Sequence, residues 1–285
     1  MFAVDHILFP TDFSARSHAM ISTVEDFAQR WHARVTVLHV LETPSYAGVA
    51  YEMLEMESVR SVARRQLDAF GASDLAGAKL ERLMLEGHTA SVIVEAANEM
   101  AASMIAMPTA GYTRFRELLL GSVTSSVLHD AEVPVLTSAH TEDAVAAPPG
   151  YRHIVCAIDL SEASVRVLEA ARDLAVRFGS TLHVVHAVPA VDERFASGPS
   201  DRAHRYLCGN AREAYPALAA AAGVTAELEV VEEPGSPADG IVAAAKRHQA
   251  GLVVAGRGQA QGFMGRLRTN IHELLRKSAA PVLSV

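Results

Sequence analysis

The sequence lacks the residues and runs that mark several common protein classes. Its 285 residues include only two cysteines, Cys156 and Cys208, which give neither a disulfide framework nor the spacing of a zinc site. No uninterrupted apolar run reaches the roughly 18 residues that suggest a membrane span. The first residues lack the basic stretch of a signal peptide. We therefore expect a cytoplasmic protein with buried, reduced cysteines.

Positive charge and catalytic signatures are also scarce. The 25 lysines and arginines are outnumbered by 33 acidic residues, and the net charge of -8 argues against a nonspecific nucleic-acid surface. Neither G-x-S-x-G nor G-x-x-x-x-G-K-[ST] occurs. Thirteen histidines are present, but His183 and His186 are three apart in one expected strand and point to opposite faces. The sequence predicts no metal site and no obvious catalytic centre.

What the chain does contain is an internal duplication. HILFPTDFS at residues 6–14 returns as HIVCAIDLS at residues 153–161, and VPVL returns as APVL near the end. The offset is constant, because Asp159 minus Asp12 and Pro281 minus Pro134 both give 147. This period is far longer than that of solenoid repeats. We predict a first domain over residues 1–138, an aperiodic linker over 139–150, and a second domain over 151–285.

Each copy alternates short apolar runs with amphipathic segments, which predicts a parallel sheet covered by helices on both faces. Ser14 is the expected N-cap of the first helix. In the first copy we expect strands at 6–10, 34–41, 79–86, 103–107 and 133–138, and helices at 14–31, 53–70, 90–100 and 122–129. In the second copy we expect strands near 152–158, 181–187, 225–231, 250–255 and 281–285.

Ligands of doubly wound sheets bind beyond the carboxyl ends of the strands, where the strand order reverses. In the first copy Pro10, Thr11 and Asp12 follow the first strand, Val40 lies near the end of the second, and the loop from Pro108 to Ser122 follows the fourth. An acid, a backbone edge and a glycine-containing loop together suit a nucleotide. Amides at a helix start, here Ser122 and Val123, attract phosphate, and Gly121 allows close approach.

The same spacing also fits simple chain turns. On this interpretation Gly111 ends a turn, Gly121 and Ser122 begin a helix, and Asp12 caps the first helix. The spacing alone leaves both interpretations open.

The residues PTDFS after the first strand, LHV in the second, and G-x9-G-S-V before a helix that ends in PVL resemble the universal stress protein family. The resemblance covers both copies. It implies a Rossmann-like α/β fold in which each domain has a five-stranded parallel sheet of strand order 3-2-1-4-5. Some members bind ATP through G-x2-G-x9-G-[ST] after the fourth strand and an aspartate after the first.

By this resemblance Asp12 would bind the ribose and the Val40 backbone would contact the adenine. Gly111, Gly121, Ser122 and Val123 would surround the phosphates, and Mg²⁺ could accompany the ATP. Pro108 stands where the family motif has its first glycine, which removes one N–H. The second copy keeps Asp159 and Thr269, has Ala187 at the position of Val40, and offers Gly256 and Gly258. Arg268 replaces Gly121 there, so we expect the poorer ATP site.

Three functions remain open. The first is a cytoplasmic stress-response module that binds ATP, hydrolyses it slowly at most, and responds to nucleotide. The second is a scaffold of the same fold that acts through protein contacts without nucleotide. The third is a slow nucleotide hydrolase, for which no general base is evident. We further expect the two domains to form an intramolecular pseudo-dimer, with a homodimer as an added possibility, and neither nucleic acid nor membrane as a partner.

Overall fold

A computed structural model describes residues 1–42, 51–75, 77–109, 120–138, 150–189, 199–233, 235–257 and 267–285. Side chains at 51–56, 189, 199–204, 233 and 267–270 lie outside this description. The chain separates into two compact units, residues 3–137 and residues 138–285 together with residues 1–2. Each unit is described by itself below.

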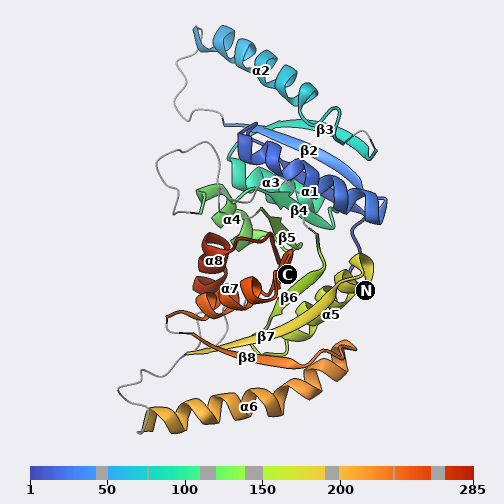
Figure 1. The fold of residues 1–285 in the computed structure, drawn as a ribbon. Helices are drawn as coiled ribbons and strands as arrows, with labels where there is room; N and C mark the ends of the chain where they lie inside the picture. The colour runs from blue at the N-terminus through green and yellow to red at the C-terminus, as the bar shows by residue number, and fades with distance from the viewer. Residues whose placement is uncertain are drawn as a thin grey trace. The chain divides into compact units, whose positions relative to one another are not determined.

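The first unit alternates strands and helices along its whole length (Figure 1). Its elements are β1 His6–Pro10, α1 Ala15–Trp31, β2 Arg34–Leu41, α2 Tyr51–Ala69, β3 Lys79–Glu86, α3 Thr89–Glu99, β4 Met104–Met107, α4 Ser122–Asp130 and β5 Val135–Thr137. The strands pair in parallel in the order β3-β2-β1-β4-β5. The predicted fold class and the strand order 3-2-1-4-5 are confirmed.

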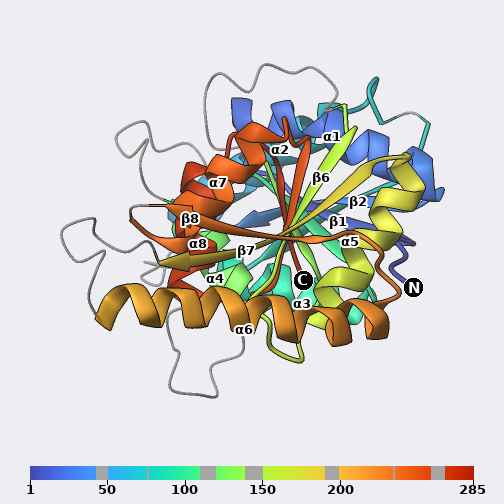
Figure 2. The same ribbon diagram turned by 60° about the horizontal axis from the view of Figure 1, so that its bottom comes forward.

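The second unit repeats this pattern. Its elements are β6 His153–Ala157, α5 Ser164–Phe178, β7 Thr181–Pro189, α6 Pro199–Ala222, β8 Leu228–Glu233, α7 Pro237–Arg247, β9 Leu252–Ala255, α8 Leu267–Lys277 and β10 Val282–Ser284. Parallel pairing gives the order β8-β7-β6-β9-β10. Figure 2 shows β6, β7 and β8 fanning out with the twist usual for parallel strands.

Helices cover both faces of the sheet in each unit. In the second unit α5 packs beside α6 and α7 packs beside α8, and Figure 1 shows α6 and α7 on opposite sides of β7 and β8. The central strands are therefore apolar throughout, as β1 shows: Ile7, Leu8 and Phe9 are all fully buried. Burial on both faces explains why these strands read as continuous apolar runs.

The first helix begins where the sequence predicts. Ser14 is the N-cap of α1, with extended backbone angles, and its hydroxyl accepts a hydrogen bond from the amide of Ser17 over 3.2 Å. The helix ends at His32, whose φ of 54° closes the C-terminus in the left-handed conformation. These two ends fix the direction of the chain on either side of α1, including the turn that follows β1.

Candidate functional site

The strand order reverses in the first repeat between β1 and β4, which are neighbours in the sheet. Ile7 pairs with Met104 and Leu8 with Ile105. Continuing this register past the strand ends places Pro108 beside Thr11. The residues that follow β1 and the loop that follows β4 therefore start from adjacent positions at the carboxyl edge.

Asp12 is held in place by hydrogen bonds within the turn after β1. One carboxylate oxygen, Oδ1, accepts from the backbone amide of Ser14 over 3.0 Å and from the hydroxyl of Ser17 over 2.7 Å. Ser14 and Ser17 are both buried, whereas Asp12 is half-buried. The described contacts fix the carboxylate through Oδ1 and orient it at the edge of the sheet.

His39, near the end of β2, holds the peptide that follows β1. Its Nδ1 donates to the carbonyl oxygen of Thr11 over 2.8 Å, while the Thr11 amide donates to the carbonyl of Leu38 over 2.8 Å. The acceptor is a carbonyl, so the hydrogen bond requires the tautomer with a proton on Nδ1. Val40 follows His39 and pairs with Leu85 of β3. The backbone on either side of Val40 is therefore fixed, by the hydrogen bond of His39 to Thr11 and by the pairing with β3.

Phe13 occupies a backbone conformation that is rare for a non-glycine residue. Its φ is 61°, and its ring stacks on His39 with 4.3 Å between ring centroids and 28° between planes. The Thr11 hydroxyl accepts from the Phe13 amide over 3.0 Å. The stacking and the hydrogen bond therefore hold the turn that carries Asp12 in a conformation that is unfavourable for the Phe13 backbone.

The N-terminus of α4 is tied to the end of β4. The amide of Gly121 donates to the carbonyl of Thr109 over 2.9 Å, and the Thr124 hydroxyl donates to the carbonyl of Pro108 over 3.0 Å. Gly121 is the N-cap, with φ -60° and ψ 143°. Gly111 lies outside the described residues. The two bonds fix the start of α4 at the carboxyl edge of the sheet.

Ser122 and Val123 are the first two residues of α4. The first helical amides have no acceptor four residues earlier within the helix, so they are open to another acceptor. The first intrahelical bond at this end is that of the Ser125 amide to Gly121. The helix therefore supplies donors and the positive end of its dipole at the edge that also carries Asp12.

The second repeat reproduces the arrangement around the aspartate. Oδ1 of Asp159 accepts from the Ser161 amide over 3.0 Å and from the hydroxyls of Ser161 and Ser164 over 2.6 and 2.7 Å. Burial opposes ionisation, but these hydrogen bonds outweigh it and lower the pKa of Asp159 below its ordinary value. His186 Nδ1 donates to the Ile158 carbonyl over 2.9 Å, as His39 does in the first repeat.

The loop after β9 differs from that after β4. Ile154 pairs with Leu252 as Ile7 pairs with Met104, so Gly256 stands at the position of Pro108. A Cβ atom at Gly256 would lie 3.2 Å from a methyl group of Val167. Gly258 lies outside the described residues. Ala187, at the position of Val40, pairs with Val231 of β8.

The start of α8 also differs from that of α4. Arg268 and Thr269 lie in the first turn of α8, which begins at Leu267. In the first repeat the aligned glycine is the N-cap instead of a helical residue. Burial and then the charge of Arg166 lower the pKa of Arg257 to about 10. The second repeat thus places arginines, and a longer helix, at the edge where the first repeat has a glycine.

The sequence predicted Asp12, Gly121 and Ser122 as site residues, and this stays a prediction; it did not point to Phe13 and Ser17, which contact the turn that carries Asp12. The Asp-x-x-x-x-Ser spacing shared with the second repeat was a signal for Ser17, because both serines bind their aspartate. The left-handed conformation of Phe13 had no such signal in the sequence. Among the described residues, no group of three or more His, Cys, Asp or Glu side chains is arranged to hold a metal ion.

Two successive units of strand order 3-2-1-4-5, each with an aspartate fixed at the reversal of strand order, define a tandem Rossmann-like α/β protein. Comparison with known proteins gives the family. The universal stress protein family matches residues 3–138 and again residues 150–285. The chain belongs to the universal stress protein family.

Individual relatives agree with this assignment. Universal stress protein MJ0531 of Methanocaldococcus jannaschii is 31% identical over 134 residues, covering 46% of this chain and 79% of its own. The crystal structure of a universal stress protein from Archaeoglobus fulgidus is 25% identical, with a TM-score of 0.66 over 99% of this chain and 96% of that chain. The crystal structure of a universal stress protein in complex with cAMP is 26% identical and covers 48% of this chain and 97% of its own, with a TM-score of 0.37, which is too low to support the assignment. No helix in the described part of the chain is long and apolar enough to cross a membrane.

Proposed function

We propose that this chain is a cytoplasmic stress-response protein whose first domain binds ATP at the carboxyl edge of its sheet. Occupancy by nucleotide would be the signal that the rest of the protein transmits. The proposed boundaries are residues 1–138 and 151–285 for the two domains, with 139–150 as the linker. We further propose that the two domains form an intramolecular pseudo-dimer.

The observation that carries the proposal is that Asp12 and the start of α4 follow two neighbouring strands, β1 and β4, at the reversal of strand order. Asp12 is fixed through Oδ1 by Ser14 and Ser17, which suits a carboxylate that accepts ribose hydroxyls. Ser122 and Val123 begin a helix that is tied to the adjacent strand and offers amides to phosphate. Pro10, Thr11 and the Val40 backbone complete the proposed contacts.

The structure also limits which donors the phosphates can use. Pro108 has no N–H, and the Gly121 amide already donates to Thr109. The proposed phosphate donors therefore begin at Ser122, one residue into the helix. The role of Gly121 is then to leave room beside those amides, since it has no side chain. Gly111 would belong to the same loop.

Magnesium would enter with the triphosphate. Mg²⁺ in nucleotide sites is held largely by phosphate oxygens and water, with one or two carboxylates. Asp12 is the carboxylate that directly follows β1, and its Oδ1 accepts hydrogen bonds from Ser14 and Ser17. Since the described residues hold no cluster of three or more metal-ligating side chains, we propose an ion that arrives with the nucleotide and no resident metal.

We propose that the second domain is the weaker site. It keeps Asp159, Gly256 and Thr269, but Arg268 and Thr269 lie inside the first turn of α8. A helix that begins earlier, with an arginine where the first repeat has glycine, would crowd the phosphate position. Gly258 and Ala187 complete the corresponding set. The scaffold function remains the alternative if neither domain holds nucleotide.

The test is the nucleotide content of the purified full-length protein. The protein is denatured, and the released small molecules are identified by mass spectrometry, with ATP, ADP and cAMP as standards. We expect ATP from the wild type and little from Gly121→Leu, because the added side chain would occupy the space beside the amides of α4. Gly121 has a φ of -60°, so a side chain there causes no backbone strain. A matched Gly209→Leu variant, on exposed α6 where an added Cβ meets no atom within 4 Å, controls for the added side chain. Absence of nucleotide from the wild type, together with no binding of added ATP, would support the scaffold instead.

A further inference from the structure

Three histidine rings of the second repeat lie together at the amino ends of its strands. His153 opens β6, His183 is in β7, and His248 is the C-cap of α7. His153 Nδ1 lies 3.1 Å from His183 Nε2, and the rings of His183 and His248 stack with 3.8 Å between centroids and 22° between planes. We call these three residues the histidine cluster. It lies at the opposite end of the strands from Asp159.

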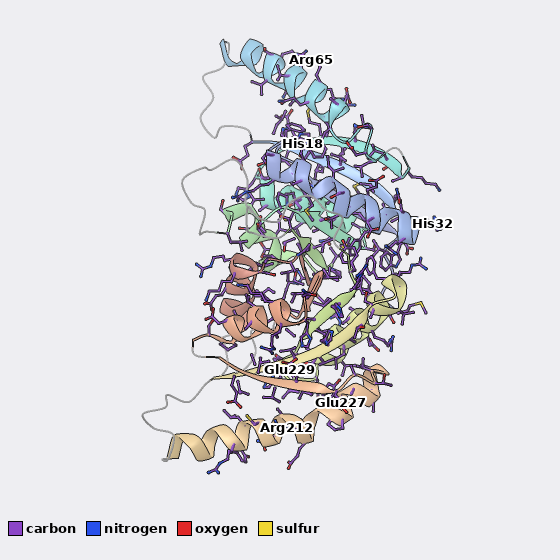
Figure 3. All side chains as sticks on the ribbon, viewed as in Figure 1. His18, His32, Arg65, Arg212, Glu227 and Glu229 are labelled. Atoms are coloured by element: carbon purple, nitrogen blue, oxygen red, sulfur yellow. The ribbon has the colours of Figure 1, made fainter. Side chains whose placement is uncertain are left out.

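One carboxylate, that of Glu229, contacts the histidine cluster at His248. Glu229 of β8, labelled in Figure 3, has Oε2 at 2.6 Å from His248 Nε2, and its other oxygen accepts from Arg247. Burial opposes ionisation of Glu229, but the hydrogen bonds from His248 and Arg247 lower its pKa below its ordinary value. The charged and titratable groups around His183 are thus His153 from β6, Arg247 and His248 from α7, and Glu229 from β8.

The contact between His153 and His183 depends on protonation. A hydrogen bond between two imidazoles needs one nitrogen with a proton and one with a free lone pair. Two imidazolium rings have no such lone pair, and their charges repel each other. His183 also stacks on His248, so a proton on His183 places its charge between two other basic rings. Burial, followed by His248 and His153, lowers its pKa below the ordinary value, against the opposing effect of Glu229.

The first repeat supplies an internal comparison. His6 opens β1 there, but Thr36 stands at the aligned position of His183, and Met100 is the C-cap where the second repeat has His248. His6 Nε2 lies 2.9 Å from the Thr36 hydroxyl, and its Nδ1 lies 3.3 Å from the Met100 carbonyl. A hydroxyl can donate or accept, so this contact does not depend on a second titrating ring.

We propose that the histidine cluster is a pH-sensitive contact that joins β6, β7 and the end of α7 at neutral pH and opens this end of the second repeat on acidification. The pairing of two rings, the stacking of a third and the absence of this arrangement from the first repeat carry the inference. The contact is independent of the proposed ATP site, which belongs to the first repeat, whereas the histidine cluster belongs to the second.

The direction of the effect follows from linkage. The folded-state pKa of His183 is below its ordinary value of 6.5, so the unfolded chain binds the proton first as the pH falls. The stabilising contribution is complete above 6.5 and is lost as the pH falls from there through the lower folded-state pKa. Local opening should occur at a higher pH than global unfolding, because the cluster joins only the amino ends of β6 and β7 to the end of α7.

The test is hydrogen–deuterium exchange of the full-length protein at about pH 7.5 and about pH 5.5, corrected for the intrinsic exchange rate. In the wild type we expect peptides from β7 and α7 to lose protection at the lower pH, and the matching peptides from β2 and α3 to lose much less. His183→Thr, which installs the residue of the first repeat, should remove most of this difference. Equal losses in the wild type and the variant would overturn the proposal, as would no loss in the wild type.

A second measurement covers the case in which His183→Thr folds poorly. The ring resonances of the wild-type histidines are followed by NMR between about pH 8 and about pH 5. We expect His183 to titrate below its ordinary pKa and to change together with His153. Titration of His183 at or above that value, with no coupled change in His153, would overturn the proposal without any variant.

Discussion

The hydroxyl of Ser17 donates to Oδ1 of Asp12 over 2.7 Å. The second repeat makes the same contact over the same distance, between Ser164 and Asp159. In both repeats the aspartate after the first strand is thus held by the first helix of that repeat, and contacts within the chain set its orientation. This preorganisation is the feature on which the proposed ATP site depends.

Replacing Ser17 by alanine should loosen Asp12 with a modest cost to folding. Removing one such hydrogen bond between side chains costs about 1 kcal/mol, and more when the remaining group is charged. We expect the Ser17→Ala protein to unfold at lower urea concentration and to retain less ATP after purification. Ser164→Ala is the matched control, which should lower stability similarly but leave ATP retention unchanged. Equal retention in wild type and Ser17→Ala would argue against preorganisation of Asp12.

The acid sensitivity of the second repeat should depend on Asp159. Its folded-state pKa lies below the ordinary value of 3.8, so the unfolded state binds the proton first. The stability it contributes is present above that value and is lost as the pH falls through the folded-state pKa. Urea unfolding between about pH 5 and about pH 3 should therefore show a steeper loss for wild type than for Asp159→Asn. Parallel profiles would contradict this account. The pH window lies well below that of the histidine cluster.

Phe13 should accept leucine without loss of the fold. Leu160 occupies the aligned position of the second repeat with a φ of 64°, close to the 61° of Phe13. The variant Phe13→Leu loses the stacking on His39, which is typically worth about 0.5–1.5 kcal/mol. Trp31, the single tryptophan, lies in α1 and its fluorescence reports on the first repeat during thermal unfolding. An unchanged transition would show that the stacking contributes nothing.

Gly87, before α3, should not accept a side chain. Its φ is 139°, and a Cβ atom there would lie 2.9 Å from a methyl group of Val92. Backbone strain of this kind costs on the order of 1–3 kcal/mol, so Gly87→Ala should lower the melting temperature of the first repeat. Gly77→Ala is the matched control, since its φ lies outside the left-handed region and its Cβ would lie 3.6 Å from the nearest atom, on Gln29. Similar melting of the two variants would show that the turn tolerates the change.

The sequence predicted the architecture well for a physical reason. Two copies in one chain double each weak signal, and the constant offset of 147 residues aligns Asp12 with Asp159 from the sequence alone. Strands buried on both faces left apolar runs that are hard to misread. The expected strand near 225–231 begins instead at Leu228, because β8 is an edge strand and less apolar than the central ones.

The site was harder to predict than the fold. The conformation of Phe13 and the tautomer of His39 depend on tertiary contacts that sequence patterns do not encode. No sequence pattern predicted the earlier start of α8, at Leu267, because the alignment with the first repeat places Arg268 at the position of Gly121, which precedes α4. The histidine cluster was missed because its members come from three separate elements and no metal-like spacing links them.

The most direct test of the proposed function is calorimetric titration of ATP with Mg²⁺ into the nucleotide-free full-length chain. The variants Asp12→Asn and Asp159→Asn form a matched pair, since asparagine can keep the Oδ1 acceptor but loses the charge and has an NH2 donor in place of the second oxygen. We predict one strong site per chain, weakened by Asp12→Asn and unchanged by Asp159→Asn. No binding by the wild type, or equal weakening by both variants, would contradict the assignment of ATP to the first domain.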